Sequence, residues 1–200
     1  MNIRLSWNFL TDWQSSGGQE AGAYADQLCI KDSHQLPYLP GKSIKGLLRD
    51  AFSTAMHNQW FADMPSNLLA LLFGDEGRNG LESQGLLQFS NAHLPAAERA
   101  YLAQQPGLSR HLFRVLHATA INPDTGVAQS SSLRAIEVAV PMQLHSDISI
   151  NTHHPHLAAI PDWQQRLPAC IDAVLPLIDA AGSKKQRGLG LVEVNRLAGD

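Results

Sequence analysis

Two kinds of apolar spacing constrain the fold of this chain more than any other feature. Alternate residues from Ile3 to Phe9 are apolar, and this period of two is typical of a strand that buries one face. The segment 142–150 repeats the same alternation. Residues 43–60 instead carry apolar side chains at intervals of three and four, which indicates an amphipathic helix that Lys42 or Ser43 would cap. A sheet covered by at least one helix is therefore expected.

The other segments extend this pattern into an order of strand, helix, strands, helix and strand. The turn sequence Asn122–Gly126 lies between two extended segments and predicts a projecting hairpin. The order favours an α+β fold of the ferredoxin-like type, in which two helices cover one face of an antiparallel sheet. The expected elements are a short helix over 68–73 that Gly74 ends, strands over 85–90, 112–121, 133–140 and 191–194, a helix or loop over 95–105, and a late helix over 168–181 that Pro176 kinks or shortens.

Length and composition indicate one ordinary globular domain over residues 1–200. A hydrophobic content of 44% supports a single core. No run of apolar residues is long enough to cross a bilayer, and the N-terminal residues do not form a secretory signal. We therefore expect an intracellular, cytoplasmic protein without a membrane partner. Cys29 and Cys170 are too few and too far apart for a disulfide framework or a metal knuckle, and we interpret both as packing thiols.

The net charge of −3 gives the chain no overall attraction to a polyanion, so any site for one must be local. The lysines are in fact concentrated in two segments, around Lys45 and around Lys185, and only Lys31 lies elsewhere. Each segment combines its cations with glycine.

The first segment is Pro40–Gly46, at the start of the expected helix. The first turn of a helix exposes unpaired N–H groups and the positive end of the helix dipole, so a phosphate there gains hydrogen bonds as well as charge pairing with Lys42 and Lys45. The alternative is that Ser43 only caps the helix while the lysines stay solvated. A Walker motif is excluded because Leu36 stands where its first glycine belongs.

The second segment is the glycine loop, residues 182–190. Its glycines allow close approach of a phosphate chain, and Lys184, Lys185 and Arg187 supply the charge. The alternative is a solvated turn. In a ferredoxin-like fold both basic segments can reach one edge of the sheet, where they would form a continuous anion track.

On these residues the chain resembles the RAMP superfamily, and within it the backbone subunits of type III CRISPR effector complexes, which act in antiviral defence. The Pro-Gly-x-Ser-x-Lys-Gly core and the terminal glycine loop are specific as a pair. The stretches that carry the resemblance follow the family's order along nearly the whole chain: Gly17-Gly18, 26–32, 36–49, 87–92, 132–138 and 188–190.

The resemblance implies a modified RNA-recognition fold that binds guide RNA (crRNA) and target RNA and assembles with other RAMP subunits and copies of itself in a filament. It implies a thumb, inserted at about 117–140, that wedges into the guide–target duplex through Leu133, Arg134 and Ile136. It also implies that residues of the two basic segments contact guide phosphates: Lys42, Ser43, Lys45, Gly46, Arg49, Lys184, Lys185, Arg187 and Gly188.

Asp26 is the candidate catalytic and metal-binding residue. Target-cleaving members of the family carry an aspartate in the loop after the first strand, before an apolar run and a second aspartate, and Asp26 to Asp32 has this pattern. A carboxylate there can bind Mg²⁺ or another divalent metal and help an RNA 2′-hydroxyl attack its own phosphate. A solvated loop carboxylate is the alternative. Asp32 is expected to shape the turn, and Asp12 is a weaker candidate.

Two other functions remain open. The chain can be a non-catalytic cap subunit of the same complex, or a guide-processing endoribonuclease that uses a histidine as general base. The candidates for that base are His34, His57, His117 and His145. The cluster His153, His154 and His156 has no recognisable metal-ligand spacing and is interpreted as a surface loop.

Overall fold

The computed structural model describes residues 1–17, 25–75, 83–105 and 107–197. Its centre is a four-stranded antiparallel sheet in the order β2-β5-β1-β6. The strands are β1 (Asn2–Phe9), β2 (Leu87–Phe89), β5 (Gln143–Ile150) and β6 (Val192–Arg196). With α1 (Gly41–His57) between β1 and β2 and α4 (Trp163–Val174) between β5 and β6, this is the βαββαβ order of a ferredoxin-like fold. The predicted fold class is confirmed.

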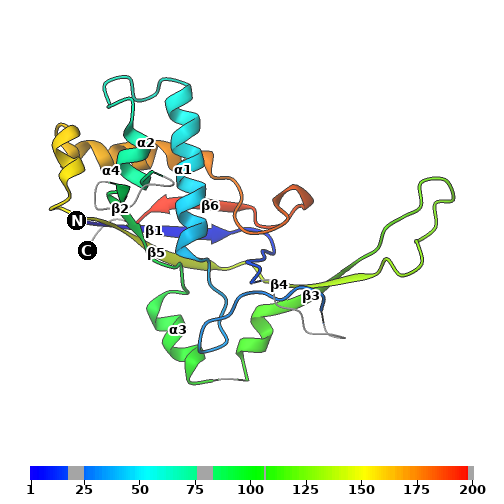
Figure 1. Ribbon diagram of the computed structural model, residues 1–200. Helices are drawn as coiled ribbons and strands as arrows, with labels where there is room; N and C mark the ends of the chain where they lie inside the picture. The colour runs from blue at the N-terminus through cyan, green and yellow to red at the C-terminus, as the bar shows by residue number, and fades with distance from the viewer. Residues whose placement is uncertain (18–24, 76–82, 106, 198–200) are drawn as a thin grey trace.

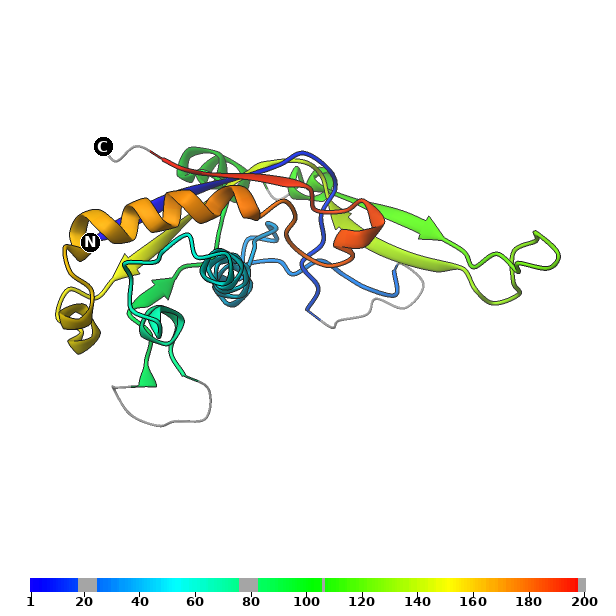
Figure 2. The ribbon, with the colours of Figure 1, turned by 90° about the horizontal axis from the view of Figure 1, so that it is seen from above.

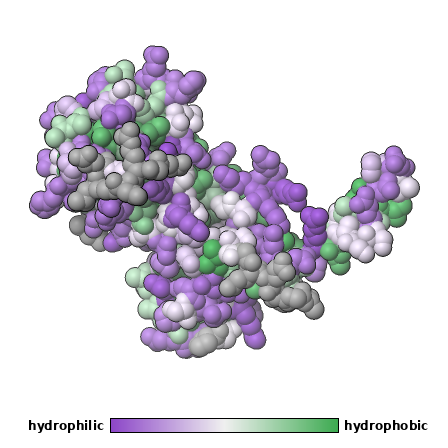
Figure 3. Space-filling model, in the orientation of Figure 1, coloured by the Kyte–Doolittle hydropathy of each residue, from purple (hydrophilic) through white to green (hydrophobic). Residues whose placement is uncertain are grey.

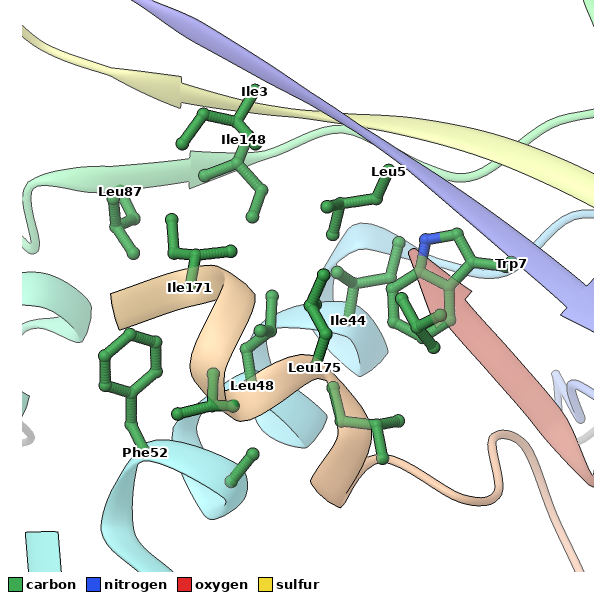
Figure 4. Packing of buried hydrophobic residues seen from close by; sticks show 14 of the residues in the cluster. Ile3, Leu5, Trp7, Ile44, Leu48, Phe52, Leu87, Ile148, Ile171 and Leu175 are labelled. Atoms are coloured by element: carbon green, nitrogen blue, oxygen red, sulfur yellow. The ribbon is translucent and has the colours of Figure 1, made fainter. Parts of the chain in front are cut away.

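Both helices cover the same face of the sheet (Figures 1 and 2). In β1 the apolar positions point to this face, and the register places Trp7 opposite Leu144 on one side and Val194 on the other. Figure 4 shows Ile44, Leu48 and Phe52 of α1 on the side of the sheet to which Ile3, Leu5 and Trp7 point. Ser146 also points into the core. Its hydroxyl is satisfied there because it accepts a hydrogen bond from the Trp7 indole N–H at 2.9 Å.

The third helix, α3 (Ala96–Ala103), lies on the other side of the sheet (Figure 2). Strands β3 (Phe113–Ala118) and β4 (Arg134–Ala139) pair only with each other as named strands and form a hairpin that projects from the body (Figure 1). The remaining elements are α2 (Leu68–Phe73) and 3₁₀ turns at Ser109–Leu112, Pro155–Ala159, Leu175–Leu177 and Lys185–Arg187.

Two helix predictions need correction. Neither Lys42 nor Ser43 caps α1, which begins at Gly41 and receives its cap from outside, because Asn91 Oδ1 accepts the Gly41 N–H at 2.8 Å. The late helix begins at Trp163 rather than at Pro168 and changes to a 3₁₀ turn after Val174. Pro176 lacks the N–H that an α-helix would need there. Pro168 lies inside α4, where its missing N–H removes one helical hydrogen bond without ending the helix. The short helix over 68–73 and its end at Gly74 are confirmed.

Both cysteines are free and buried, as predicted for packing thiols. Among the described residues, no helix is both long enough and apolar enough to span a membrane.

Candidate nucleic-acid interface

Helix α1 separates its residues into a buried face and a basic stripe. Ile44 and Leu48 face the core with no exposed surface. Lys42, Lys45 and Arg49 follow at intervals of three and four on another face. This basic stripe lines a pocket of about 590 Å³, the helix pocket, whose opposite wall comes from the segments on either side of residues 76–82.

Two smaller residues of the first segment were also predicted to contact RNA. Gly46 belongs to the lining of the helix pocket. A side chain added at Gly46 would meet nothing within 4 Å, so the helix surface is open there. Ser43 is half-buried and lies outside that lining. The structure therefore groups Gly46, but not Ser43, with the basic stripe.

The glycine loop is shaped by two close backbone approaches at its ends. A Cβ on Gly182 would lie 2.5 Å from the Gln14 carbonyl oxygen, and one on Gly190 would lie 2.0 Å from that of Ala181. Between them Lys184 has a φ of 59° and Gly188 a φ of 78°, with a 3₁₀ turn between the two. Gly188 has no atom near its Cβ position, so only its backbone conformation favours glycine.

Among the described residues, the two basic segments line different pockets. Lys184 and Arg187 of the glycine loop line a pocket of about 730 Å³ together with the base of the hairpin, and the basic stripe of α1 lines the helix pocket. Lys185 is exposed and lies outside both linings. The two segments form two cationic sites in these pockets, and their union into one anion track stays a prediction.

The pocket of the glycine loop, here called the hairpin pocket, also contains Asp26. The Asp26 N–H donates to the Ala135 carbonyl at 2.8 Å, and its Oδ2 accepts the Ala135 N–H at 2.8 Å. Both bonds use the free edge of β4, so the Asp26 segment extends the hairpin by part of a third strand. Asp26 remains solvent-exposed, although one carboxylate oxygen is engaged.

The walls of the hairpin pocket combine apolar and cationic side chains. Leu116 pairs with Ile136 and Ala118 pairs with Arg134 across the hairpin, and all four residues belong to the pocket lining. Burial lowers the pKa of Lys184, and the neighbouring charges of Arg187 and Arg134 lower it further, while Asp26 opposes the change. Three cations therefore surround one carboxylate, which suits a ligand that carries negative charge.

The thumb residues predicted from sequence lie on this hairpin. Leu133 is 70% exposed, and Ile121 and Val127 near the tip are also more than half exposed. Figure 3 shows apolar side chains along the projecting hairpin. An apolar hairpin tip outside the core is available for contact with another molecule.

A segment that sequence reasoning missed connects these parts. Residues 12–16 run between the glycine loop and the hairpin: the Asp12 carbonyl accepts the Gly190 N–H at 2.7 Å, and Trp13 exchanges two backbone hydrogen bonds with Ala139. Gln14 is fully buried, and its amide donates to the Glu137 carbonyl at 3.1 Å. Residues 12–15 of this connecting segment are buried.

Asp12, the weaker candidate for the catalytic carboxylate, lies in this connecting segment. Asp12 is 5% exposed and forms an ion pair with Arg114 of β3, so it is not an accessible metal ligand. Glu137 has a similar role: it is 2% exposed, pairs with Lys31 at 2.9 Å and accepts the Cys29 N–H at 3.1 Å. These bonds fix the residues that follow Asp26 against β4.

Asp32 shapes its turn as predicted. Its Oδ1 accepts the N–H groups of His34 and Leu36 at 2.8 and 3.0 Å, and its Oδ2 pairs with Arg99 at 2.9 Å. It lies outside the hairpin pocket lining, which excludes it as the partner of Asp26 there.

The candidate histidines do not lie together. His34 and His145 line one pocket together with His93, whereas His57 ends α1 and His117 lies on β3. His154 is 6% exposed and its ring packs against that of His156 at 4.4 Å, so the surface-loop interpretation is wrong for His154. No group of three metal-ligating side chains occurs among the residues that the structure describes.

The face of the sheet away from α1 and α4 bears on how RNA is bound. RNA-recognition domains stack bases on aromatic side chains of this face. Here it carries Arg4, Ser6 and Asn8 of β1, and no Phe, Tyr or Trp of the described strands points to it. The other strands contribute one imidazole and otherwise non-aromatic polar side chains: Gln88, Gln143, His145, Asp147, Ser149, Glu193 and Asn195.

The chain thus combines a ferredoxin-like sheet with a projecting hairpin, a basic helix stripe and a cationic glycine loop. The RAMP superfamily model matches residues 9–193, and this chain belongs to that superfamily.

Solved structures show the same fold. A chain described as "Cryo-EM structure of the Type III-B Cmr-beta bound to cognate target RNA" superposes with a TM-score of 0.69 at 10% identity, covering 98% of this chain and 97% of that one. A chain of "Type III-B Cmr-beta Cryo-EM structure of the Apo state" gives 0.67 at 13% identity, with the same coverage. No curated protein matches the sequence.

Proposed function

We propose that this chain is a guide-RNA-binding backbone subunit of a type III CRISPR effector complex and that it cleaves guide-paired target RNA through Asp26. The observation that carries the proposal is the hairpin pocket, where Asp26 lies among Arg134, Lys184 and Arg187. Membership of the RAMP superfamily and a fold shared with a Cmr-beta complex bound to target RNA support the biological setting.

The guide is held through its phosphates. Lys42, Lys45 and Arg49 of α1 bind one stretch of backbone, with the surface at Gly46 leaving room for it, and Ser43 supplies a hydroxyl beside them. Lys184, Lys185, Arg187 and Gly188 of the glycine loop bind the next stretch. Since the two sites are separate pockets, the guide contacts them with successive nucleotides rather than at one point.

Cleavage uses the 2′-hydroxyl of the target. Asp26 accepts the proton from that hydroxyl, and the 2′-oxygen then forms a bond to the adjacent phosphorus. The bond between phosphorus and the 5′-oxygen breaks, which leaves a cyclic 2′,3′-phosphate. Water protonates the departing 5′-oxygen. Arg134, Lys184 and Arg187 stabilise the charge that develops on the phosphoryl oxygens.

The residues around Asp26 fit a divalent metal only when RNA is present. Asp26 is one carboxylate with one oxygen engaged by a backbone N–H, and Mg²⁺ commonly binds one or two carboxylates together with substrate phosphates. When bound, the metal would lower the pKa of the attacking hydroxyl and neutralise phosphate charge.

The hairpin serves as the thumb. Leu133, Arg134 and Ile136 enter the guide–target duplex and open it beside Asp26. In a filament of copies of this chain, each thumb places one cut at a regular interval.

The cleavage test uses the complex reconstituted with guide RNA, labelled complementary RNA and magnesium. Asp26→Asn keeps the size of the side chain and the acceptor for Ala135, and it should lower the cutting rate roughly 10²-fold or more. Asp63→Asn, at a side chain that is 86% exposed, is the matched control and should cut normally. Equal rates for Asp26→Asn and the wild type would assign the chemistry to another residue.

The same assay separates the alternatives. A cap subunit would bind guide RNA and show no cutting in the wild type. A histidine-dependent guide-processing ribonuclease would cut the guide precursor without metal, and Asp26→Asn would leave that activity intact. One observation favours testing His34 and His145 first, because they line the same pocket.

A further inference from the structure

Helix α3 lies on the face of the sheet opposite to α1 and α4 (Figure 2). A third pocket is lined by residues of this face and of α3. Its volume is about 690 Å³, within the range of small-molecule sites. Neither basic segment contributes to its lining. We call it the histidine pocket, and its polar lining residues are Arg4, His34, Ser90, Asn91, His93, Arg99, His145 and Asp147.

Two guanidinium groups in the histidine pocket keep unused hydrogen-bond donors. Arg4 contacts Asp147 through Nε alone, at 3.2 Å. Arg99 contacts Asp32 through one terminal nitrogen at 2.9 Å, and its buried Nε has no partner among the described residues. A guanidinium has five N–H groups. A single contact therefore leaves other N–H donors of each arginine for a ligand.

The imidazoles add a second set of polar groups. His93 and His145 are held side by side by two backbone hydrogen bonds of 2.6 and 2.9 Å. The His145 Nε2 is buried and has no partner among the described residues. The His93 ring stacks on Tyr38 at 5.5 Å between centroids. The two imidazoles therefore add polar groups to the wall of the pocket.

Helix α3 also contributes an apolar surface. Ala96, Ala100 and Ala103 line the pocket at intervals of three and four. These small side chains lie on the same helix as Arg99, whereas Arg4 comes from β1. The pocket thus combines cationic, hydrogen-bonding groups with an apolar surface.

We propose that the histidine pocket binds a ribonucleotide by its phosphate group, with Arg4 and Arg99 on the phosphate and the base against the alanine face of α3. Arginine forks match phosphate oxygens in geometry and charge. The nucleotide is either free or part of an RNA strand. This site is independent of the proposed cleavage function, because it shares no residue with the hairpin pocket or the helix pocket.

The test measures binding of fluorescent AMP, of adenosine and of a short single-stranded RNA to the purified chain. Arg4→Ala is the main variant, because its side chain is 58% exposed and its loss does not endanger the fold. It should weaken binding of the phosphate-bearing probe about tenfold, the effect of one lost charge-assisted hydrogen bond. Arg110→Ala removes an exposed arginine that bonds only its neighbour His111 in the described structure, and it should bind normally.

The probes separate the sources and the failures. Binding of AMP that Arg4→Ala weakens supports a free nucleotide. Binding of the RNA probe without binding of AMP supports an RNA strand as the ligand. In that case Arg4→Ala must also weaken RNA binding in a protein that already carries Lys45→Ala and Lys185→Ala, because those changes remove cations of the two basic segments. Adenosine that binds as well as AMP would overturn the phosphate assignment, and so would equal affinities of Arg4→Ala and the wild type. Absence of binding by all three probes would overturn the site, whatever the outcome of the cleavage assay.

Discussion

At the scale of single residues, buried charge decides how the candidate site is held. Glu137 is almost fully buried, and its carboxylate receives both the Lys31 ammonium group and the Cys29 N–H. Burial and the charge of Glu137 raise the pKa of the Cys29 thiol to about 12. Cys29 is therefore no nucleophile at neutral pH. Its role is to carry a backbone donor for Glu137.

Glu137→Ala tests this anchor. Removing the carboxylate leaves the Cys29 N–H buried without its acceptor and Lys31 without its partner, so we expect a loss of roughly 2–4 kcal/mol in the free energy of unfolding. Urea denaturation measures it. Arg4→Ala breaks an exposed ion pair with side chains 58% and 42% accessible and serves as the control, with an expected change below about 1 kcal/mol. Similar losses in both variants would contradict the anchoring role of Glu137.

Asp32 predicts a dependence of stability on pH. Burial works against its ionisation, but the N–H groups of Leu36 and His34 and the Arg99 guanidinium outweigh it and lower the pKa of Asp32 below its ordinary value of 3.8. A carboxyl group with a lowered pKa in the folded state stabilises the protein above the unfolded value, and that contribution is lost as the pH falls through the folded value.

Asp32→Asn keeps an oxygen for the two backbone N–H groups but removes the charge. It should be less stable than the wild type at neutral pH by about 1–2 kcal/mol. The difference should shrink as the pH falls below 3.8, because the wild-type carboxyl then becomes neutral too. Urea denaturation over a series of pH values measures both, and a constant difference down to acidic pH would show that charge is not the cause.

At the scale of elements, the glycine loop owes its shape to contacts with its neighbours. Gly190 stands against the Ala181 carbonyl, and Gly188 faces open space, yet both have a positive φ. The sequence shows two similar glycines, and only the structure distinguishes them.

Gly188→Ala and Gly190→Ala form a matched pair. Gly188→Ala has only the strain of a left-handed backbone, about 1–2 kcal/mol. Gly190→Ala adds a collision with backbone atoms and should destabilise the loop and the last strand severely, by more than about 4 kcal/mol. Thermal denaturation of the two proteins compares them, and equal melting temperatures would refute the tight approach at Gly190.

At the scale of the whole molecule, the β3–β4 hairpin projects from the body that the sheet and helices form. Its tip, residues 119–133, contacts neither helix of the main layer, whereas its base is tied to the connecting segment by Trp13 and Ala139. The same base carries Asp26 through Ala135. Movement of the hairpin and placement of Asp26 are therefore mechanically linked.

Replacing residues 119–133 by a short turn tests this division. Because the tip adds no residue to the core cluster, the free energy of unfolding should change by less than about 1 kcal/mol. The regular spacing of target cuts should be lost while guide binding persists, as measured on the reconstituted complex. Unfolding of the shortened protein would show that the tip supports the body. Regular cuts after shortening would contradict the thumb role.

Local patterns in the sequence determined the fold class. The period-two alternation of β1 and β5 and the helical spacing of α1 are local properties, and the burial of one face follows directly from them. Turn chemistry at Asn122–Gly126 was also sufficient to place the hairpin. The basic segments and Asp26 could be found because their residue types stand close together along the chain.

Only the tertiary structure decided which of those residues meet. It separated the basic stripe of α1 from the glycine loop, because β2 and α2 border one pocket and the hairpin borders the other. It buried Asp12 against Arg114 and capped α1 with Asn91, both across long stretches of sequence. It also brought Arg4, His93, Arg99 and His145 around one pocket. Such contacts depend on strand order and register, and no local period of the sequence encodes them.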